Sequence, residues 1–296
     1  LRDTMFRLGS ANLRAIALAS QHDGIALDDG ARASQWLSAR AARTADRVDA
    51  LLAEHALAQL RGRAQDVRSV LARLERAQPG SAASRRLRVL DWLYGDGDSL
   101  TADAAALELE ALTGADPASS LASSEAWAAN VCVVGQWRLE RGDSAGVQRA
   151  VRALVSRVAG ARAPSAPVSA APGLCTELLA AGDAVLGRRR DAPLRLQRLD
   201  SLVLAPHVVG DLAQYAPLLL ARLHERTGDR RGALAAIRRR SYMSDWPRYR
   251  AAMLREEGRL ARQAGDSAGS RRATARYLMY RDSVAPADDR RRQVTP

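Results

Sequence analysis

Large apolar residues recur at helical spacing on both sides of a series of glycines. Five residues before these glycines the chain has Leu57, Trp92, Trp137, Leu223 and Leu260, with Gly182 as the exception. Apolar residues return nine and twelve residues after the turn, as Val151 and Leu154 do after Gly142. Because residues three or four apart share one helix face, each glycine is predicted to separate two helices that bury facing apolar stripes.

The pattern predicts an all-α chain of antiparallel helix pairs. Ala, Leu and Arg dominate the composition and favour helices, and the chain has one Phe, five Trp and six Tyr. We expect pairs at 46–61 and 64–77, 83–95 and 101–114, 124–141 and 144–159, 172–187 and 192–204, 211–227 and 230–241, and 247–264 and 267–281. A divergent pair is expected near 3–21 and 29–44.

The turns carry a Gly-Asp signature. The clearest copies begin at Gly142, Gly228 and Gly265, and weaker ones centre on Gly62, Gly97 and Gly187. Glycine fits the left-handed position after a helix, and Asp next to it caps the helix that follows. The turns recur every 35 to 45 residues. A period of this size indicates an α-solenoid of stacked helix pairs, a class that usually binds other molecules.

Composition limits the function. All 45 basic residues are Arg, so a P-loop, a protein kinase ATP site and a pyridoxal-phosphate enzyme are excluded, because each needs a Lys. The net charge of +12 permits an acidic partner. The uninterrupted apolar runs are too short for a membrane span, so no membrane insertion is expected.

The sequence suggests a division into segments. We expect a divergent N-terminal helix pair at 1–44, helical repeats at 45–158 and 174–285, a Pro/Ala/Ser-rich loop at 159–173 and a charged tail at 286–296. Whether the loop separates two subdomains or interrupts one array is left open. The chain opens on Leu1 without an initiator Met, so we expect it to be part of a longer polypeptide.

Residues around the turns resemble tetratricopeptide repeats. When the turn glycine is counted as repeat position 15, the small residue of position 8 falls on Gly135, Ala221 and Gly258. The apolar position 24 falls on Val151 and Ile237, while Thr274 departs from the pattern. The repeats are therefore similar to degenerate tetratricopeptide units.

The stretches NVCVVGQWRLERGD and LLLARLHERTGDRRGALAAIRRRSY resemble the C-terminal repeat regions of large bacterial signalling proteins, in which a serine/threonine kinase or winged-helix domain precedes a helical array. This resemblance implies a non-catalytic protein-interaction or regulatory module. It also implies a cytoplasmic location, or an extracytoplasmic one if the parent protein has a membrane segment upstream.

In tetratricopeptide arrays, positions 2, 5, 9 and 12 of each first helix face a concave groove. By the same counting, Arg222, Arg255, Arg259 and Arg262 are candidate groove residues for an acidic peptide or a C-terminal carboxylate, which Arg binds through two hydrogen bonds. The alternative is a solvated charged face with Glu256 and Glu257 as neighbours.

Clustered arginines suggest nucleic-acid binding as the alternative function. They are 188–190, 230–231 and 238–240. Acidic residues are interspersed, and no aromatic residues alternate with these clusters as stacking platforms would.

No motif points to chemistry. The four histidines are scattered, and no set of ligands with metal-site spacing is present, so no metal or other cofactor is expected. No catalytic residue is expected, because the chain has neither a Gly-x-Ser-x-Gly elbow nor a Cys/His signature. Cys132 and Cys175 could pair, but their apolar helical surroundings favour two buried free thiols.

Overall fold

The computed structural model describes residues 34–36, 38–41, 43–114, 124–160, 170–203, 211–239 and 249–282. Throughout these residues the regular structure is helical, with no strand. The helices are α4 (Thr44–Arg61), α5 (Ala64–Ala77), α6 (Ala82–Tyr94), α7 (Ser99–Gly114), α8 (Ser124–Glu140), α9 (Ser144–Gly160), α10 (Ala170–Leu186), α11 (Ala192–Val203), α12 (Asp211–Arg226), α13 (Arg230–Arg238), α14 (Arg250–Gln263) and α15 (Ser267–Asp282).

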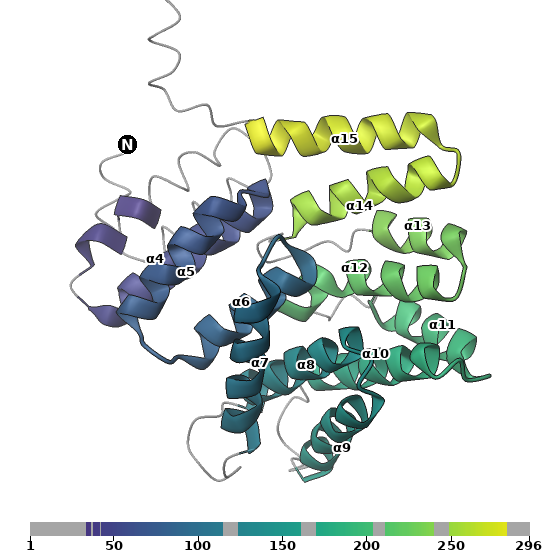
Figure 1. The fold of residues 1–296 in the computed structure, drawn as a ribbon, viewed down its shortest axis with the longest axis horizontal. Helices are drawn as coiled ribbons and strands as arrows, with labels where there is room; N and C mark the ends of the chain where they lie inside the picture. The colour runs from purple at the N-terminus through teal and green to yellow at the C-terminus, as the bar shows by residue number, and fades with distance from the viewer. Residues whose placement is uncertain are drawn as a thin grey trace, which may run out of the picture. The chain divides into compact units, whose positions relative to one another are not determined.

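The predicted all-α class and the helix pairs are confirmed (Figure 1). Every helix end lies within three residues of the expected one. The predicted helix at 3–21 and the tail at 286–296 fall outside the described residues, as does the first part of the helix at 29–44, of which 34–36 and 38–40 are described and helical.

The chain divides into two compact units. Unit 1 combines Leu1–Pro79 with Trp246–Pro296, and unit 2 spans Gly80–Asp245. The described helices of unit 1 are therefore α4, α5, α14 and α15, and those of unit 2 are α6 to α13. Unit 2 includes helices from both sides of residues 159–173.

The Gly-Asp turns have the predicted geometry. Gly142, Gly228 and Gly265 have φ of 72°, 82° and 78°, which places them in the left-handed region. The next residue closes the turn: the Asp143 N–H donates to the Arg138 carbonyl at 2.9 Å, and equivalent bonds form at Asp229 and Asp266. Each Asp then caps the second helix; Asp143 Oδ1, for example, accepts the Gly146 N–H at 2.9 Å.

The second glycine of the motif, Gly146 or Gly232, makes room for this cap. A Cβ at Gly146 would lie 2.5 Å from Asp143 Oδ2 and 2.7 Å from Arg138 Cδ. Glycine is favoured here because any larger residue would displace the capping carboxylate or the Arg138 side chain.

Two of the weaker turns depart from the motif. At Gly187 the left-handed residue is Arg188, with φ of 47°, so the turn is displaced by one position. Gly97 does not adopt the left-handed conformation, and the cap of α7 is supplied by Asp98, whose Oδ2 accepts the Thr101 N–H at 2.8 Å.

Small residues lie where the two helices of a pair approach each other closely. A Cβ at Gly135 of α8 would lie 3.2 Å from Ala150 Cβ of α9. One at Gly258 of α14 would lie 3.8 Å from Ala273 Cβ of α15. Ser270 also donates from Oγ to the Gly258 carbonyl at 2.9 Å, so these backbones pack closely.

In unit 2, α6 packs against α8, α8 against α10, and α10 against α12. The second helices α7, α9 and α11 each pack against the first helix of the next pair. This order of contacts is compatible with a helical repeat. In unit 1, α4 packs against α14 and α15 although these helices are far apart in the sequence. Ala56, Leu57 and Leu60 form a buried cluster there, with Tyr280 against it.

Candidate functional site

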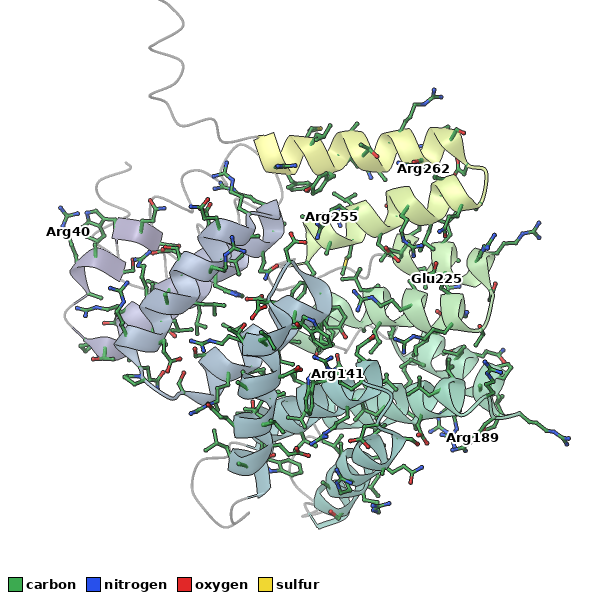
Figure 2. All side chains as sticks on the ribbon, viewed as in Figure 1. Arg40, Arg141, Arg189, Glu225, Arg255 and Arg262 are labelled. Atoms are coloured by element: carbon green, nitrogen blue, oxygen red, sulfur yellow. A yellow bond between two sulfur atoms is a disulfide. The ribbon has the colours of Figure 1, made fainter. Side chains whose placement is uncertain are left out.

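The four arginines predicted from the sequence fall in different units. Arg222 lies on α12 of unit 2, and Arg255, Arg259 and Arg262 lie on α14 of unit 1. A single groove lined by all four remains a prediction. We call the three residues of α14 the α14 arginine row; Figure 2 labels Arg255 and Arg262.

The α14 arginine row lies on one helix face, because its members are spaced by four and three residues. The Arg255 guanidinium is 5.9 Å from the centre of the Tyr277 ring. Arg259 donates from Nε to Glu256 at 2.9 Å and from Nη1 to Gln263 at 3.1 Å. Arg262 is exposed and has no ion pair with any described residue. The row therefore combines Arg259, which is paired with Glu256, with the exposed side chains of Arg255 and Arg262.

Arg222 faces an internal carboxylate. Its guanidinium lies 3.8 Å from Glu140 Oε1 and 5.4 Å from the centre of the Tyr94 ring. Arg226, one turn along α12, donates to Glu140 Oε2 at 2.6 Å. Glu140 thus occupies the place that the prediction assigns to a ligand carboxylate.

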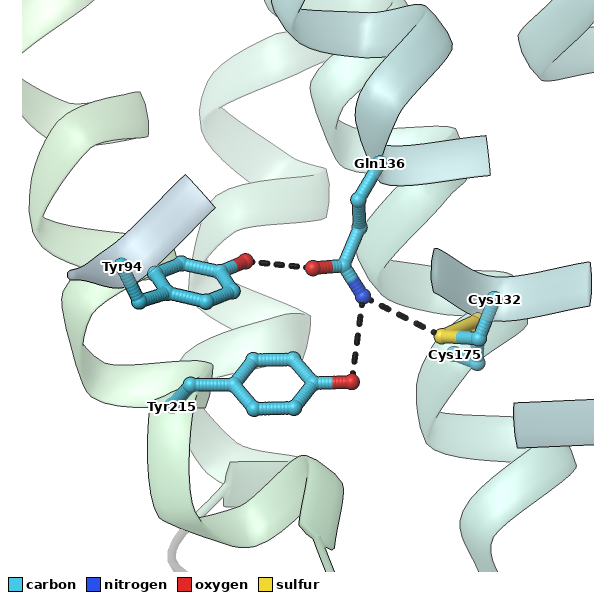
Figure 3. The surroundings of a disulfide bond; sticks show 5 residues. All are labelled: Tyr94, Cys132, Gln136, Cys175 and Tyr215. Carbon is cyan, nitrogen blue, oxygen red and sulfur yellow. Dashed lines mark hydrogen bonds between the residues drawn. A yellow bond between two sulfur atoms is a disulfide. The ribbon is translucent and has the colours of Figure 1, made fainter. Parts of the chain in front are cut away.

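The face of unit 2 shared by α6, α8, α10 and α12 is closed by its own side chains (Figure 3). Tyr94 and Tyr215 stack with ring centres 4.7 Å apart. The Tyr94 hydroxyl donates to Gln136 Oε1, and Gln136 Nε2 donates to the Tyr215 oxygen and to Cys132 Sγ, each at 3.3 Å. None of these four side chains is more than 2 % exposed. We call them the inner face of unit 2.

A disulfide between Cys132 and Cys175 lies beside the inner face. The prediction of two free thiols is therefore wrong. The cysteines are 43 residues apart, about one repeat, and their Cα atoms are 5.8 Å apart. Equivalent positions of stacked helices lie side by side, so this separation brings the two sulfurs together. The sequence contained a signal for this bond, because the separation of 43 residues matches the repeat period.

Two glycines allow the close approach of α8 and α10. A Cβ at Gly135 would lie 2.5 Å from Leu179 Cδ1, and one at Gly182 would overlap the Leu139 side chain. Each helix thus inserts a leucine over a glycine of the other. Residue numbers rise together along the two helices, from Gly135 against Leu179 to Leu139 against Gly182. The helices α8 and α10 therefore run parallel. This explains why Gly182 breaks the apolar pattern of the sequence.

Gln136 and Tyr94 were missed by the sequence reasoning. The counting that places Arg222 and Arg259 at position 9 also places Gln136 there, so a signal was present.

Trp137, which the pattern assigns to the helix-pair core, is buried and donates from Nε1 to Asp103 at 2.7 Å. Trp92 is half-buried beneath the Arg141 guanidinium, 5.0 Å from its ring centre.

Carboxylates with a lowered pKa cap helices or form ion pairs with arginines. The hydrogen bond from the Gly146 N–H lowers the pKa of Asp143, and that from the Thr101 N–H lowers the pKa of Asp98. Hydrogen bonds from Arg195 and Arg189 lower the pKa of Asp191. These groups are ionised near neutral pH, so none of the three is suited to donate a proton there. Among the described residues, no cluster of three or more His, Cys, Asp or Glu could hold a metal ion.

No helix in the described part of the chain is long and apolar enough to cross a membrane. Comparison with known proteins gives no relative: no family model, curated protein or solved structure matches the chain.

Proposed function

We propose that this chain is a non-catalytic protein-interaction module, built as an α-solenoid of tetratricopeptide-like repeats, that binds an acidic segment of a partner protein. The observation that carries the proposal is the α14 arginine row, which presents Arg255 and Arg262 to solvent on one helix face. Guanidinium groups spaced along a helix suit the carboxylates of an acidic peptide.

The α14 arginine row is preferred to the inner face of unit 2. A peptide would have to displace the stacked Tyr94 and Tyr215 rings and leave Gln136 without its buried partners. Leaving a buried polar group unpaired costs about 1–3 kcal/mol. Arg222 is also less available, because Glu140 already neutralises it.

The disulfide supports one of the two expected compartments. Disulfides form and persist in oxidising environments and are rare in a reducing cytoplasm. Both sulfurs are buried, since Cys132 is 2 % exposed and Cys175 1 %. We therefore favour the extracytoplasmic alternative over a cytoplasmic location. The module would be the sensing or scaffolding part of a larger signalling protein, as the resemblance to such repeat regions implies.

A peptide titration tests the proposal. A fluorescent oligo-glutamate peptide is expected to bind the full oxidised chain, with an affinity that falls as salt rises. Replacing Arg255, Arg259 and Arg262 with Ser should weaken binding about tenfold or more. The matched control replaces three exposed arginines of α15, Arg271, Arg272 and Arg276, with Ser. Equal weakening in both variants would show a general charge effect and reject the site.

A further inference from the structure

Four arginines at two successive turns of unit 2 form a second basic surface. Arg188 and Arg190 lie in the turn between α10 and α11, and Arg230 and Arg231 begin α13 after the turn from α12. All four are exposed, and Figure 1 shows both turns on the same side of unit 2. The two turns belong to neighbouring pairs, because α10 and α11 both pack against α12. We call these four residues the turn edge.

The turn edge is set apart by its lack of internal partners. Arginines elsewhere in α10 to α13 are paired: Arg195 with Asp191, Arg198 with Glu177, Arg226 with Glu140, and Arg239 with Asp200. Arg189, between two members of the edge, pairs with Asp191 at 2.8 Å. The four edge residues have no ion pair with any described residue.

The two nearby carboxylates serve the turns themselves. Asp191 is held by Arg189 and Arg195. Asp229 caps α13 through the Gly232 N–H at 2.8 Å and contacts His224 Nδ1 at 3.1 Å. Neither carboxylate has an ion pair with a member of the edge, so the described part of the chain leaves its four guanidinium groups without a salt bridge.

Two of the edge arginines occupy electrostatically unfavourable positions. Arg230 and Arg231 lie in the first turn of α13, where the positive end of the helix dipole disfavours a cation. Arg188 and Arg190 lie between the end of α10 and the start of α11, where the opposite ends of two helix dipoles meet. A local rule broken without compensation is typical of a functional surface.

We propose that the turn edge docks unit 2 on an anionic phospholipid surface. Arginine binds the phosphates of lipid headgroups, and clustered basic residues are attracted to anionic membranes. Leu194, in the first turn of α11, is 69 % exposed close to Arg190 in the sequence. A bilayer interface accommodates such an apolar side chain, whereas a nucleic-acid backbone offers it no partner. The disulfide also favours an oxidising compartment outside the cytoplasm over one in which the chain would meet nucleic acid.

This surface is distinct from the α14 arginine row and does not depend on the proposed function. The test measures cosedimentation of the full oxidised chain with vesicles of phosphatidylcholine, alone or mixed with phosphatidylglycerol. We expect binding to the mixed vesicles only. The variant R188S/R190S/R230S/R231S should bind them at least about tenfold more weakly.

The control variant R271S/R272S/R276S/R281S removes the same charge from exposed positions of α15, and it should lose less than about threefold. L194S, which leaves the charge unchanged, should weaken binding severalfold. Equal losses in the two fourfold variants would overturn the proposal, as would binding to neutral vesicles.

A fluorescent DNA duplex distinguishes the nucleic-acid alternative. Tighter binding to the duplex than to vesicles, with no effect of L194S, would reject the membrane surface in favour of nucleic acid. Circular dichroism and thermal melting complete the test. The edge variant should melt at or above the temperature of the unmodified chain, and a lower melting temperature would show that these arginines serve the fold. Failure of the acidic-peptide titration leaves the vesicle result unaffected.

Discussion

Gln136 and Arg259 occupy the same counted repeat position on first helices in different units, yet their surroundings are opposite. Gln136 is 1 % exposed and bridges two tyrosines, whereas Arg259 is half-buried on a charged face. In unit 2 the neighbouring first helices supply Tyr94 and Tyr215, which fill the space that a ligand would need. The difference teaches that a repeat position fixes the direction of a side chain on its helix, while the neighbouring repeats decide whether a ligand can reach it.

The largest expected change in stability comes from the disulfide beside the inner face of unit 2. Replacing Cys132 and Cys175 with Ala should lower the free energy of unfolding of unit 2 by about 2–4 kcal/mol, because the crosslink restricts a long loop of the unfolded chain. Urea denaturation of the full chain, oxidised or treated with a phosphine reductant, measures the effect. Superimposable curves for the oxidised and reduced chains would contradict it.

The glycines of the α8–α10 contact offer the next largest effect. Gly182→Ala should destabilise the chain by about 1–3 kcal/mol, because the added methyl group overlaps Leu139. Gly173→Ala, on the same helix but with nothing within 4 Å of the new Cβ, is the matched control. It should be neutral or stabilise by up to about 1 kcal/mol. Similar melting temperatures for the two variants would argue against the close packing.

Variants at the turns test whether the two units differ only in their helix faces or also in the stability of their turns. Asp143→Ala in unit 2 and Asp266→Ala in unit 1 should each cost about 0.5–2 kcal/mol, because each removes a helix cap. Asp49→Ala, at an exposed position of α4, is the control and should cost little. Clearly unequal costs at the two turns would mean that the turns themselves differ between units.

The Asp143 cap also depends on pH. The pKa of Asp143 is lowered in the folded chain by the Gly146 hydrogen bond, so its contribution is present above the unfolded pKa of about 3.9. It is lost as the pH falls through the lower folded value. Asp143→Asn keeps a capping oxygen but cannot titrate. Acid denaturation should therefore show a weaker pH dependence for this variant, and an unchanged profile would exclude Asp143 as a contributor.

The smallest expected effect concerns the ion pairs of unit 2. Glu140→Gln removes the carboxylate that neutralises Arg222 and Arg226. The free energy of unfolding should fall by up to about 1 kcal/mol, in the range of a partly exposed ion pair. The variant R222S/R226S, which removes the other side of the same pairs, should cost a similar amount. Urea denaturation measures both, and an unchanged free energy of unfolding for E140Q would mean that these pairs do not stabilise unit 2.

Most of the fold was predictable because its signals are local. Helix periodicity and the Gly-Asp turn depend on residues close in sequence, and both were confirmed at Gly142, Gly228 and Gly265. The turn at Gly187 differed because Arg188 takes the left-handed position, which the residue type does not suggest. The role of Gly146 was also missed, since it follows from the position of the Asp143 carboxylate in space.

The candidate site was less predictable because it depends on contacts between repeats. The single-repeat counting that selected Arg222 does not contain Glu140, which comes from a helix two pairs earlier in the chain. The stacking of Tyr94 on Tyr215 joins residues far apart in sequence. Such contacts depend on how successive pairs are rotated against each other, and that rotation is not encoded by the period.

The disulfide has a mechanical consequence. Cys132 and Cys175 are 43 positions apart in the sequence, and the segment between them includes α9 and its turn. If the ends of unit 2 were pulled apart, this segment could not extend while the crosslink is intact. The fully stretched chain would be shorter by about 140 Å, at roughly 3.3 Å per residue. Tension applied to the chain would therefore pass from α8 to α10 through the crosslink and bypass α9.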